Sequence, residues 1–575
     1  MEIEDILVPE KRERQLLPGD FEVTTWEAVK PYFDNLLTRE IQSAEDLRQW
    51  FNDRSELEAV LSENLAWRYI KMTCDTSDES LRESYTEFIT KIEPEIAPVS
   101  NELNKKALAS PYLDALKSEA GYPIMIRELE KDARLFREEN IPLKTEEQQE
   151  SQKFGAISGA MTVEFDGQEM TLPQASNKLQ STDRAEREEA YRKITQRRLQ
   201  DKDQLNELFT RLIKLRDQIG KNADFANYRD YMFEAMGRFD YTPQDCFDFH
   251  EAVAQEVAPL LNDLAKARKE KLGVDALRPW DKAVDPSGQP PLKPFADGNE
   301  LTEKTIQTFG RLDSYLGERI AVMRKMGHLD LESRKGKAPG GYNYPLSETG
   351  VPFIFMNATS NLRDMVTMMH EGGHAVHSFL TRDLELTNFQ NTPSEVAELA
   401  SMSMELISMD YWHLFFSDEE ELKRAKREHL EQIIETLPWV ATIDKFQHWI
   451  YEHPAHSVAE RTQQWLNIYD TFSDTITDWS GLEDEKEHVW QKQLHLYEVP
   501  FYYIEYGFAQ LGAIAVWKNY KEDAAKGLEG YKNALKLGYT KTIPEVYEAA
   551  NIKFDFSTDY IRSLIQFVKE ELERV

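Results

Sequence analysis

The stretch over residues 368–377 reads Met-Met-His-Glu-Gly-Gly-His-Ala-Val-His, and it constrains the fold more than any other part of the chain. His370 and His374 are four residues apart, and an α-helix places such a pair one turn apart on one face. Apolar residues at helical spacing surround the pair, so the sequence predicts a helix here. On that helix both imidazoles can bind one Zn²⁺, and Glu371 can reach the water that the metal activates.

A catalytic zinc site has three protein ligands and one open position, so a third ligand must come from elsewhere. His377 lies about 10 Å beyond His370 along the helix, which predicts a supporting or packing role for it. Residues 394–406 predict the next helix, and Glu398 and Glu405 fall on one face of it. A carboxylate buried there is costly unless a metal pairs with it. The spacing favours Glu398 as the ligand without excluding its neighbours, and Glu405 is a candidate to orient a histidine.

Helical spacing of apolar residues recurs along most of the chain, including residues 202–219, 243–274 and 301–326. Residues 161–172 differ, because two runs typical of strands flank Asp166-Gly167, which predicts a β-hairpin. We therefore expect a mainly α fold with a small β element. We place a soft boundary near residue 195, between an N-terminal helical domain over 1–195 and a domain over 196–575 that carries the metal site.

A short apolar run over residues 351–358 predicts a strand just before the metal helix. As an edge strand it could pair with an extended peptide by strand addition. As an ordinary core strand it could not, and the sequence leaves both alternatives open.

Charge and cysteine content exclude several classes of function. The chain of 575 residues has 103 acidic and 69 basic residues and a net charge of −34, which disfavours binding to nucleic acid or anionic membranes. Cys74 and Cys246 have no partner nearby in sequence, so we expect no disulfide framework and a reducing, cytoplasmic compartment. An acidic N-terminus and the absence of a run of about 18 apolar residues predict neither a signal peptide nor a membrane span. Oligomeric state is not readable from the sequence.

The extended motifs resemble the oligoendopeptidase F branch of the thimet oligopeptidase family. Four motifs in the C-terminal half carry the resemblance: His370-Glu371-x-Gly373-His374-x-x-His377, Ala397-Glu398-x-Ala400-Ser401, residues 336–342 and residues 500–506. The resemblance implies a nearly all-helical ellipsoid with a deep channel, zinc held by two histidines and a glutamate, and cleavage of short peptides rather than folded proteins. It places the third zinc ligand at Glu398. Many relatives have Cys where this chain has Asn343, so thiol activation through that position is not available here.

A group of aromatic residues follows His495. Pro500 suits the first position of a helix, and Tyr502 and Tyr506 would then share one face, with Tyr503 beside them. Such a stripe is also typical of core packing, but tyrosine hydroxyl groups can stabilise the oxyanion of peptide hydrolysis. The resembling family uses a histidine and tyrosines from this region in that role. On this resemblance we assign the role to His495, Tyr502 and Tyr506.

The sequence thus predicts a zinc-dependent endopeptidase, with one zinc per chain, that hydrolyses internal bonds of short oligopeptides by metal-activated water. His370, His374 and Glu398 hold the metal, and Glu371 is the general base. One alternative is a metal-dependent exopeptidase, a carboxypeptidase or dipeptidase, on the same helical scaffold. Another is a helical binding protein without catalytic activity.

Overall fold

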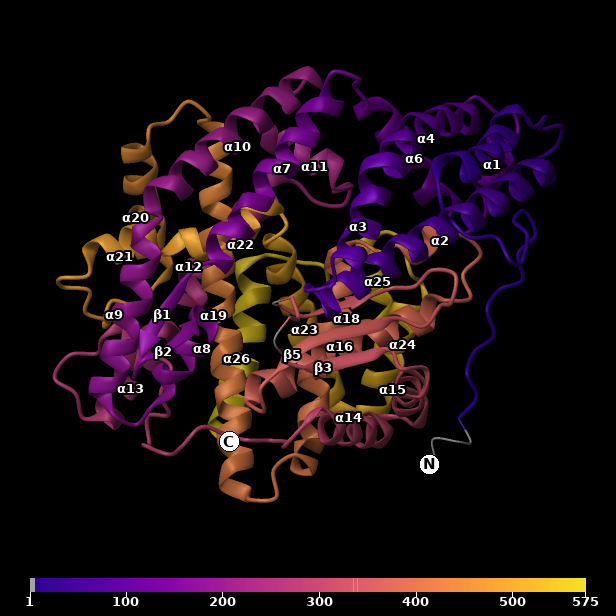
Figure 1. Ribbon diagram of the computed structural model, residues 1–575. Coiled ribbons are helices and arrows are strands. Elements are labelled where there is room, and N and C mark those ends of the chain that lie inside the picture. The colour runs from indigo at the N-terminus through magenta and orange to yellow at the C-terminus, as the bar shows by residue number, and fades with distance from the viewer. Residues whose placement is uncertain (1–5, 335, 339) are drawn as a thin grey trace. The chain divides into compact units, whose positions relative to one another are not determined.

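The computed structural model describes residues 6–334, 336–338 and 340–575, and most of these residues lie in helices (Figure 1). The mainly α fold that we predicted is therefore confirmed. The chain divides into two compact units. The first unit takes Met1–Leu135, Lys293–Lys423 and Gly512–Phe554, and the second takes Phe136–Leu292, Arg424–Leu511 and Asp555–Val575. Among the described residues, no helix combines the length and apolar character that a membrane crossing requires.

The elements of the first unit are α1 (Trp26–Thr38), α2 (Ala44–Cys74), α3 (Glu79–Glu87), η2 (Phe88–Ile92), α4 (Glu93–Leu108), α5 (Leu113–Leu116), α6 (Tyr122–Leu135), α14 (Gly298–Leu312), α15 (Ser314–Met326), β3 (Leu329–Glu332), β4 (Tyr342–Tyr344), β5 (Phe353–Ala358), α16 (Leu362–Thr381), α17 (Thr387–Gln390), α18 (Ser394–Ile407), η5 (Ser408–Leu414), α24 (Ala524–Lys536) and α25 (Ile543–Ala549). Two helices contribute residues to both units, α19 (Glu419–Glu452) and α23 (Ile504–Glu522).

The elements of the second unit are α7 (Asn140–Gly159), β1 (Thr162–Phe165), β2 (Gln168–Thr171), α8 (Leu172–Ser176), η3 (Asn177–Gln180), α9 (Arg184–Gln200), α10 (Lys202–Asn222), α11 (Tyr228–Ala235), α12 (Pro243–Glu256), α13 (Ala258–Leu272), η4 (Pro279–Asp281), α20 (Val458–Phe472), α21 (Glu483–His488), η6 (Val489–Lys492), α22 (Leu494–Glu498) and α26 (Thr558–Arg574). Residue 195 lies inside α9, and the domain division that we placed near it stays a prediction.

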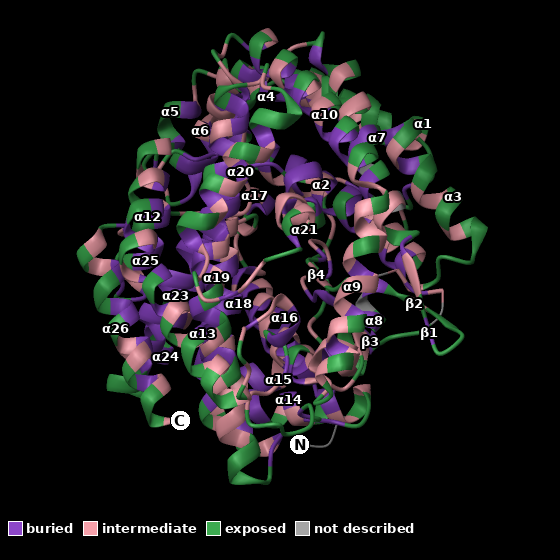
Figure 2. Ribbon diagram, turned by 90° about the vertical axis from the view of Figure 1, so that its left-hand side faces the viewer, coloured by how far each residue is buried: buried purple, intermediate pink, exposed green. Residues whose placement is uncertain are grey.

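Most helices bury one side and expose the other, as Figure 2 shows for α10 and α26. In α10 the buried apolar residues include Leu205, Leu208, Phe209 and Leu212, which recur at the three- and four-residue spacing of one helix face. The helix that the sequence predicted over 202–219 is therefore confirmed, and its apolar stripe contributes to the core of the second unit.

The helix α16, which carries His370 and His374, follows a three-stranded sheet in the first unit. The strand order is β3-β5-β4, with β3 parallel and β4 antiparallel to β5. The strand expected over 351–358 is β5, and it lies in the centre of the sheet. Both of its edges are paired, so the alternative that this strand adds a peptide is wrong. The two edge strands of this sheet are β3 and β4.

The β-hairpin predicted over residues 161–172 forms as β1 and β2 in the second unit. The strands are antiparallel, with Phe165 opposite Gln168. Asp166 and Gly167 have φ values of 51° and 75°, and a two-residue turn that matches the twist of its strands needs positive φ at both positions.

Two expected helices are each interrupted. The stretch 301–326 forms α14 and α15, because Asp313 adopts an extended conformation and its side chain accepts the Tyr315 N–H at 2.8 Å. The stretch 243–274 divides into α12 and α13 at Val257, two residues before Pro259. A new helix starts at each break, at the capping Asp313 in the first case and at the early Pro259 in the second. The apolar spacing alone did not reveal these helix starts.

Candidate metal centre

The helix α16 begins at a reciprocal cap. Asn361 Oδ1 accepts the Asp364 N–H at 2.9 Å, and Asp364 Oδ2 accepts the Asn361 N–H at 3.3 Å. These bonds satisfy donors that a helix start would otherwise leave open. The cap fixes where α16 starts, and therefore which of its residues face α18.

α16 and α18 approach each other closely at Gly373. A Cβ atom at this position would lie 2.7 Å from the Ala400 carbonyl oxygen and 2.7 Å from the Ser401 Cα. Only glycine avoids these contacts without a shift of one helix. The Tyr531 hydroxyl on α24 donates a hydrogen bond of 2.7 Å to the same Ala400 carbonyl oxygen. This bond links α24 to α18.

His370 and His374 of α16 converge with Glu398 of α18. The distance from His370 Nε2 to Glu398 Oε2 is 3.3 Å, and that from His374 Nε2 to the same oxygen is 3.6 Å. One donor atom from each residue lies within 4.8 Å of the others. A tetrahedron with metal–ligand bonds of about 2.0–2.1 Å has edges of about 3.3–3.4 Å. The spacing of these donors therefore fits one tetrahedral zinc ion.

Further hydrogen bonds fix the orientation of these side chains. His370 Nδ1 lies 2.6 Å from Glu405 Oε1, so Nδ1 donates its hydrogen and Nε2 keeps its lone pair for a metal. Ser401 Oγ lies 3.0 Å from Glu398 Oε2 and donates to it. The geometry thus agrees with the orienting role that the sequence suggested for Glu405.

The ionisable groups of the centre shift one another's pKa values. Burial lowers the pKa of His370, but Glu398 and Glu405 outweigh it and raise this pKa well above its ordinary value. At His374 burial prevails and lowers the pKa to about 4. Burial opposes ionisation of Glu398, yet His374 and His370 hold its pKa at about 2. An ionised carboxylate between two imidazoles is a donor set that a divalent cation satisfies.

Glu371 is buried beside this group, with 7% of its surface exposed. Burial is the main cause that raises the pKa of its carboxyl group to about 7, against the opposing charge of His370. Asn343 on β4 donates a hydrogen bond of 3.3 Å to the Glu371 carbonyl oxygen, which connects the edge strand with the metal helix. A carboxyl group with this pKa can accept and release a proton near neutral pH.

His377 is buried but lies outside the group of donor atoms. Burial lowers the pKa of its ring to about 3, so the ring is neutral at physiological pH. This agrees with the packing or supporting role that we expected from its distance along the helix.

The residues His495, Tyr502, Tyr503 and Tyr506 form a separate ring cluster in the second unit. The ring centroid of His495 lies 6.0 Å from that of Tyr502, 4.9 Å from that of Tyr503 and 5.8 Å from that of Tyr506. The helix does not begin at Pro500 as we expected, but at Ile504. The reason is Phe501, which has a φ of 68° and donates its N–H to Gln447 Oε1 at 2.6 Å. Tyr502 therefore precedes the helix, and its contact with Tyr506 does not come from helical spacing.

The ring orientation of His495 follows from two hydrogen bonds of Gln493. Trp439 Nε1 can only donate, and it lies 3.1 Å from Gln493 Oε1, so the amide nitrogen of Gln493 faces the other way. This Nε2 atom lies 2.7 Å from His495 Nδ1 and donates to it. In the neutral ring, His495 Nε2 then carries the hydrogen and can serve as a donor.

Three supporting residues were not assigned from the sequence: Ser401, Asn343 and Gln493. Ser401 is three residues after Glu398, a helical spacing that could have indicated the bond between them. The contact of Asn343 with Glu371 spans 28 residues and that of Gln493 with Trp439 spans 54, so no local pattern indicates them. The bond from Gln493 to His495 spans only two residues, and this proximity could have indicated it.

Comparison with known proteins places this geometry in a family. The chain matches the model described as "Peptidase family M3" over residues 178–565 and the "Peptidase M3 N-terminal domain" over residues 19–136. It is 23% identical over 504 residues to "Oligoendopeptidase F homolog" of Lactococcus lactis subsp. lactis (strain IL1403), which covers 84% of this chain and 80% of that protein.

Solved structures with the same fold extend over nearly the whole chain. One, titled "PZ PEPTIDASE A with inhibitor 2", has a TM-score of 0.90 and 26% identity and covers 100% of this chain and 99% of that chain. A putative oligoendopeptidase F from Bacillus anthracis str. Ames has a TM-score of 0.86 and 25% identity, with coverage of 98% and 99%. Because the family model alone matches more than half of the sequence, the protein is a peptidase that belongs to peptidase family M3, in its oligoendopeptidase F branch.

Proposed function

We propose that this peptidase is a zinc-dependent endopeptidase that hydrolyses internal bonds of short oligopeptides. The observation that carries the proposal is the convergence of His370, His374 and Glu398 at the spacing of a tetrahedral zinc ion. The buried carboxyl group of Glu371 beside them supports a hydrolytic rather than a structural metal.

His370, His374 and Glu398 would hold the zinc, and Glu371 would act as general base. When bound, Zn²⁺ lowers the pKa of a water molecule toward about 7 and polarises the scissile carbonyl group. Glu371 takes the proton from the attacking water and passes it to the nitrogen of the leaving amine. The C–N bond breaks as this nitrogen gains the proton, so one water molecule is consumed for each bond cleaved.

His495, Tyr502 and Tyr506 are proposed to stabilise the oxyanion of the tetrahedral intermediate. Their rings form one cluster, and when the His495 ring is neutral its Nε2 atom carries the hydrogen. Preorganised donors of this kind stabilise charge as it develops. Tyr503 belongs to the same cluster and remains the alternative to either tyrosine.

The edge strand β4 is the proposed place for the peptide backbone. Among the described strands β4 pairs with β5 alone, and Asn343 connects it to the carbonyl group of Glu371. An extended peptide that adds to this edge would be bound through its main chain, which favours cleavage of many sequences. The names of the relatives, such as "Oligoendopeptidase F homolog", support an internal cut and short substrates.

The proposal is tested with end-blocked, quenched peptides of increasing length, with and without a chelator. We expect cleavage at internal bonds, an upper limit on length, loss of activity with the chelator and recovery with added zinc. His370→Ala should abolish activity, whereas His413→Ala, at an exposed histidine of η5, should not. Cleavage that requires a free terminus would instead identify an exopeptidase. Activity that is fully retained after metal removal would overturn the zinc mechanism.

A further inference from the structure

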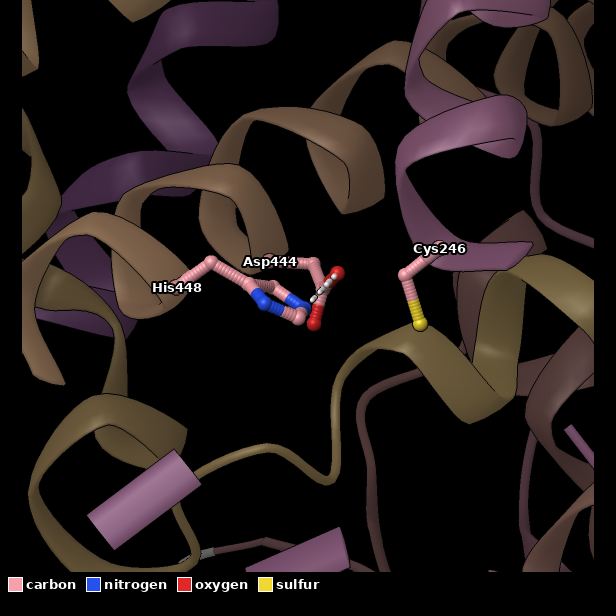
Figure 3. A group of neighbouring side chains, drawn as sticks. All are labelled: Cys246, Asp444 and His448. Atoms are coloured by element: carbon pink, nitrogen blue, oxygen red, sulfur yellow. Dashed lines mark ion pairs between the residues drawn. The ribbon is translucent and has the colours of Figure 1, made fainter. Parts of the chain in front are cut away.

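A second group of metal-binding side chains lies in the second unit. Cys246 from α12 and Asp444 and His448 from α19 each offer a donor atom, and these atoms lie within 4.8 Å of one another. Figure 3 shows the His448 ring facing the Asp444 carboxylate, with the Cys246 sulfur on the other side of that carboxylate. The proposed reaction uses none of them.

The spacing of the group follows a simple pattern. Cys246 and His250 are four residues apart on α12, and Asp444 and His448 are four residues apart on α19. Each pair therefore occupies one face of its helix, and the two faces meet. The contact between the helices is direct, because His250 Nε2 lies 2.8 Å from Asp444 Oδ2.

The side chains of this group are completely buried. Cys246 and Asp444 are 0% exposed, and His250 and His448 are 1% exposed. Aromatic rings surround His448, with the ring centroids of Phe247 and Phe501 at 4.8 and 5.5 Å. Water therefore has little access, and each polar atom needs a partner from the protein or a bound ion.

Several of these polar atoms lack such a partner. Neither ring nitrogen of His448 has a hydrogen-bond partner among the described residues, and the same holds for Asp444 Oδ1. His448 Nε2 lies 3.2 Å from Asp444 Oδ2, but without the geometry of a hydrogen bond. The ring nitrogens of His448 and the Oδ1 atom of Asp444 are thus buried at close range without hydrogen-bond partners among the described residues, which indicates a ligand that both side chains can bind.

We propose that Cys246, Asp444 and His448 form a second metal site, which binds a structural Zn²⁺. A thiolate, an imidazole and a carboxylate are the donor types that zinc takes, and the two oxygens of Asp444 can complete four donors. His250 is a positioning residue, because its bond to Asp444 Oδ2 orients the carboxylate. The metal would join α12 to α19 inside the second unit.

This site has a consequence for the tyrosine cluster of the same unit. Gln447, between Asp444 and His448 on α19, accepts the Phe501 N–H at 2.6 Å. Phe501 in turn immediately precedes Tyr502. A metal that fixes this part of α19 therefore also fixes the turn that presents Tyr502.

The test uses the full-length protein, produced with Co²⁺ in place of Zn²⁺. The catalytic centre offers only nitrogen and oxygen donors, so a charge-transfer band from sulfur to cobalt reports a cysteine site alone. We expect this near-ultraviolet band in the unchanged protein, together with two cobalt ions per chain. His370→Ala should reduce the metal content to one per chain and retain the band.

Cysteine variants provide the matched pair. Cys246→Ser should lose the band and one metal ion, whereas Cys74→Ser should keep both. Cys74 is a suitable control because burial and Asp330 raise the pKa of its thiol to about 12, which disfavours a thiolate ligand.

The readout on the unchanged protein does not depend on whether a variant folds. One metal ion per chain without a sulfur-to-cobalt band would overturn the second site and leave the zinc peptidase proposal intact. A band that Cys74→Ser removes and Cys246→Ser retains would overturn the assignment to Cys246. If the unchanged protein bound one cobalt ion and showed the sulfur-to-cobalt band, the first centre would hold no metal. That result would contradict the catalytic proposal and support the second site.

Discussion

Glu371 is expected to move a proton, and this distinguishes it from the proposed metal ligands beside it. Glu371→Gln keeps the size of the side chain but removes its basic oxygen. We expect kcat to fall by at least about 10²–10⁴-fold, because general-base catalysis contributes a factor of this size, while one zinc stays bound at this centre. Peptide hydrolysis and metal analysis of the same sample measure the two effects. A variant with near-normal kcat would show that another group accepts the proton.

Glu405 is expected to act through His370 rather than on the substrate. Gln at position 405 can still accept the His370 Nδ1–H through its amide oxygen, whereas Leu cannot. Glu405→Leu should therefore weaken zinc binding by about 10–100-fold, and Glu405→Gln by much less. Competition with a zinc-binding dye measures both affinities. Equal affinities in the two variants would mean that the bond between Glu405 and His370 does not support the metal.

The contact between α16 and α18 depends on the absence of a side chain at Gly373. In Gly373→Ala the new methyl group would meet the backbone of Ala400 and Ser401 at 2.7 Å, so the helices must separate. We expect a loss of stability of about 1–3 kcal/mol from overpacking, and weaker zinc binding because Glu398 moves with α18. Urea unfolding and zinc titration measure these changes.

The control for this prediction is another helical glycine of the first unit. A Cβ at Gly310 in α14 would have no neighbour within 4 Å. Gly310→Ala should therefore stabilise the protein by about 0.5–1 kcal/mol and leave zinc binding unchanged. If Gly373→Ala behaved like Gly310→Ala, the close approach of the two helices would not be needed for the metal centre.

Elements whose signals are local were predictable from the sequence, and elements fixed by distant partners were not. The hairpin at Asp166-Gly167 and the metal helix around His370 are specified by nearby residues. The central position of β5 depends on pairing with β3 and β4, which the sequence of β5 does not encode. The turn at Phe501 depends on Gln447, 54 residues earlier.

The same distinction applies to the two candidate sites. The proposed ligands His370 and His374 are one turn apart, so their convergence follows from helix geometry. Glu398 needed the resemblance to select it among its neighbours, because helix packing decides which face of α18 meets α16. Cys246 was not connected to any site, because its partners Asp444 and His448 lie on a helix nearly 200 residues later.

The chain carries a net charge of −34, so its carboxylates decide how it responds to acid. One of them, Asp281 in the second unit, is completely buried between Arg184 and Arg187, at 2.7 and 2.8 Å. Burial raises the pKa of Asp281, but the bonds to the two arginines outweigh this and leave it below its ordinary value. The unfolded chain therefore binds this proton first as pH falls, and acid favours unfolding.

The contribution of Asp281 should be complete at neutral pH and decline as pH falls below about 4, the pKa of an unfolded aspartate. Asp281→Asn leaves Arg187, which is 3% exposed, without its ion pair. We expect this variant to lose about 3–5 kcal/mol of stability at pH 7, and its disadvantage to shrink as pH falls below 4. Asp263→Asn, at an exposed position of α13, should change stability by less than about 0.5 kcal/mol. Urea unfolding from pH 3 to pH 7 measures the free energy of unfolding of the three proteins. If the difference between Asp281→Asn and the unchanged protein did not depend on pH, the effect would come from packing rather than from charge.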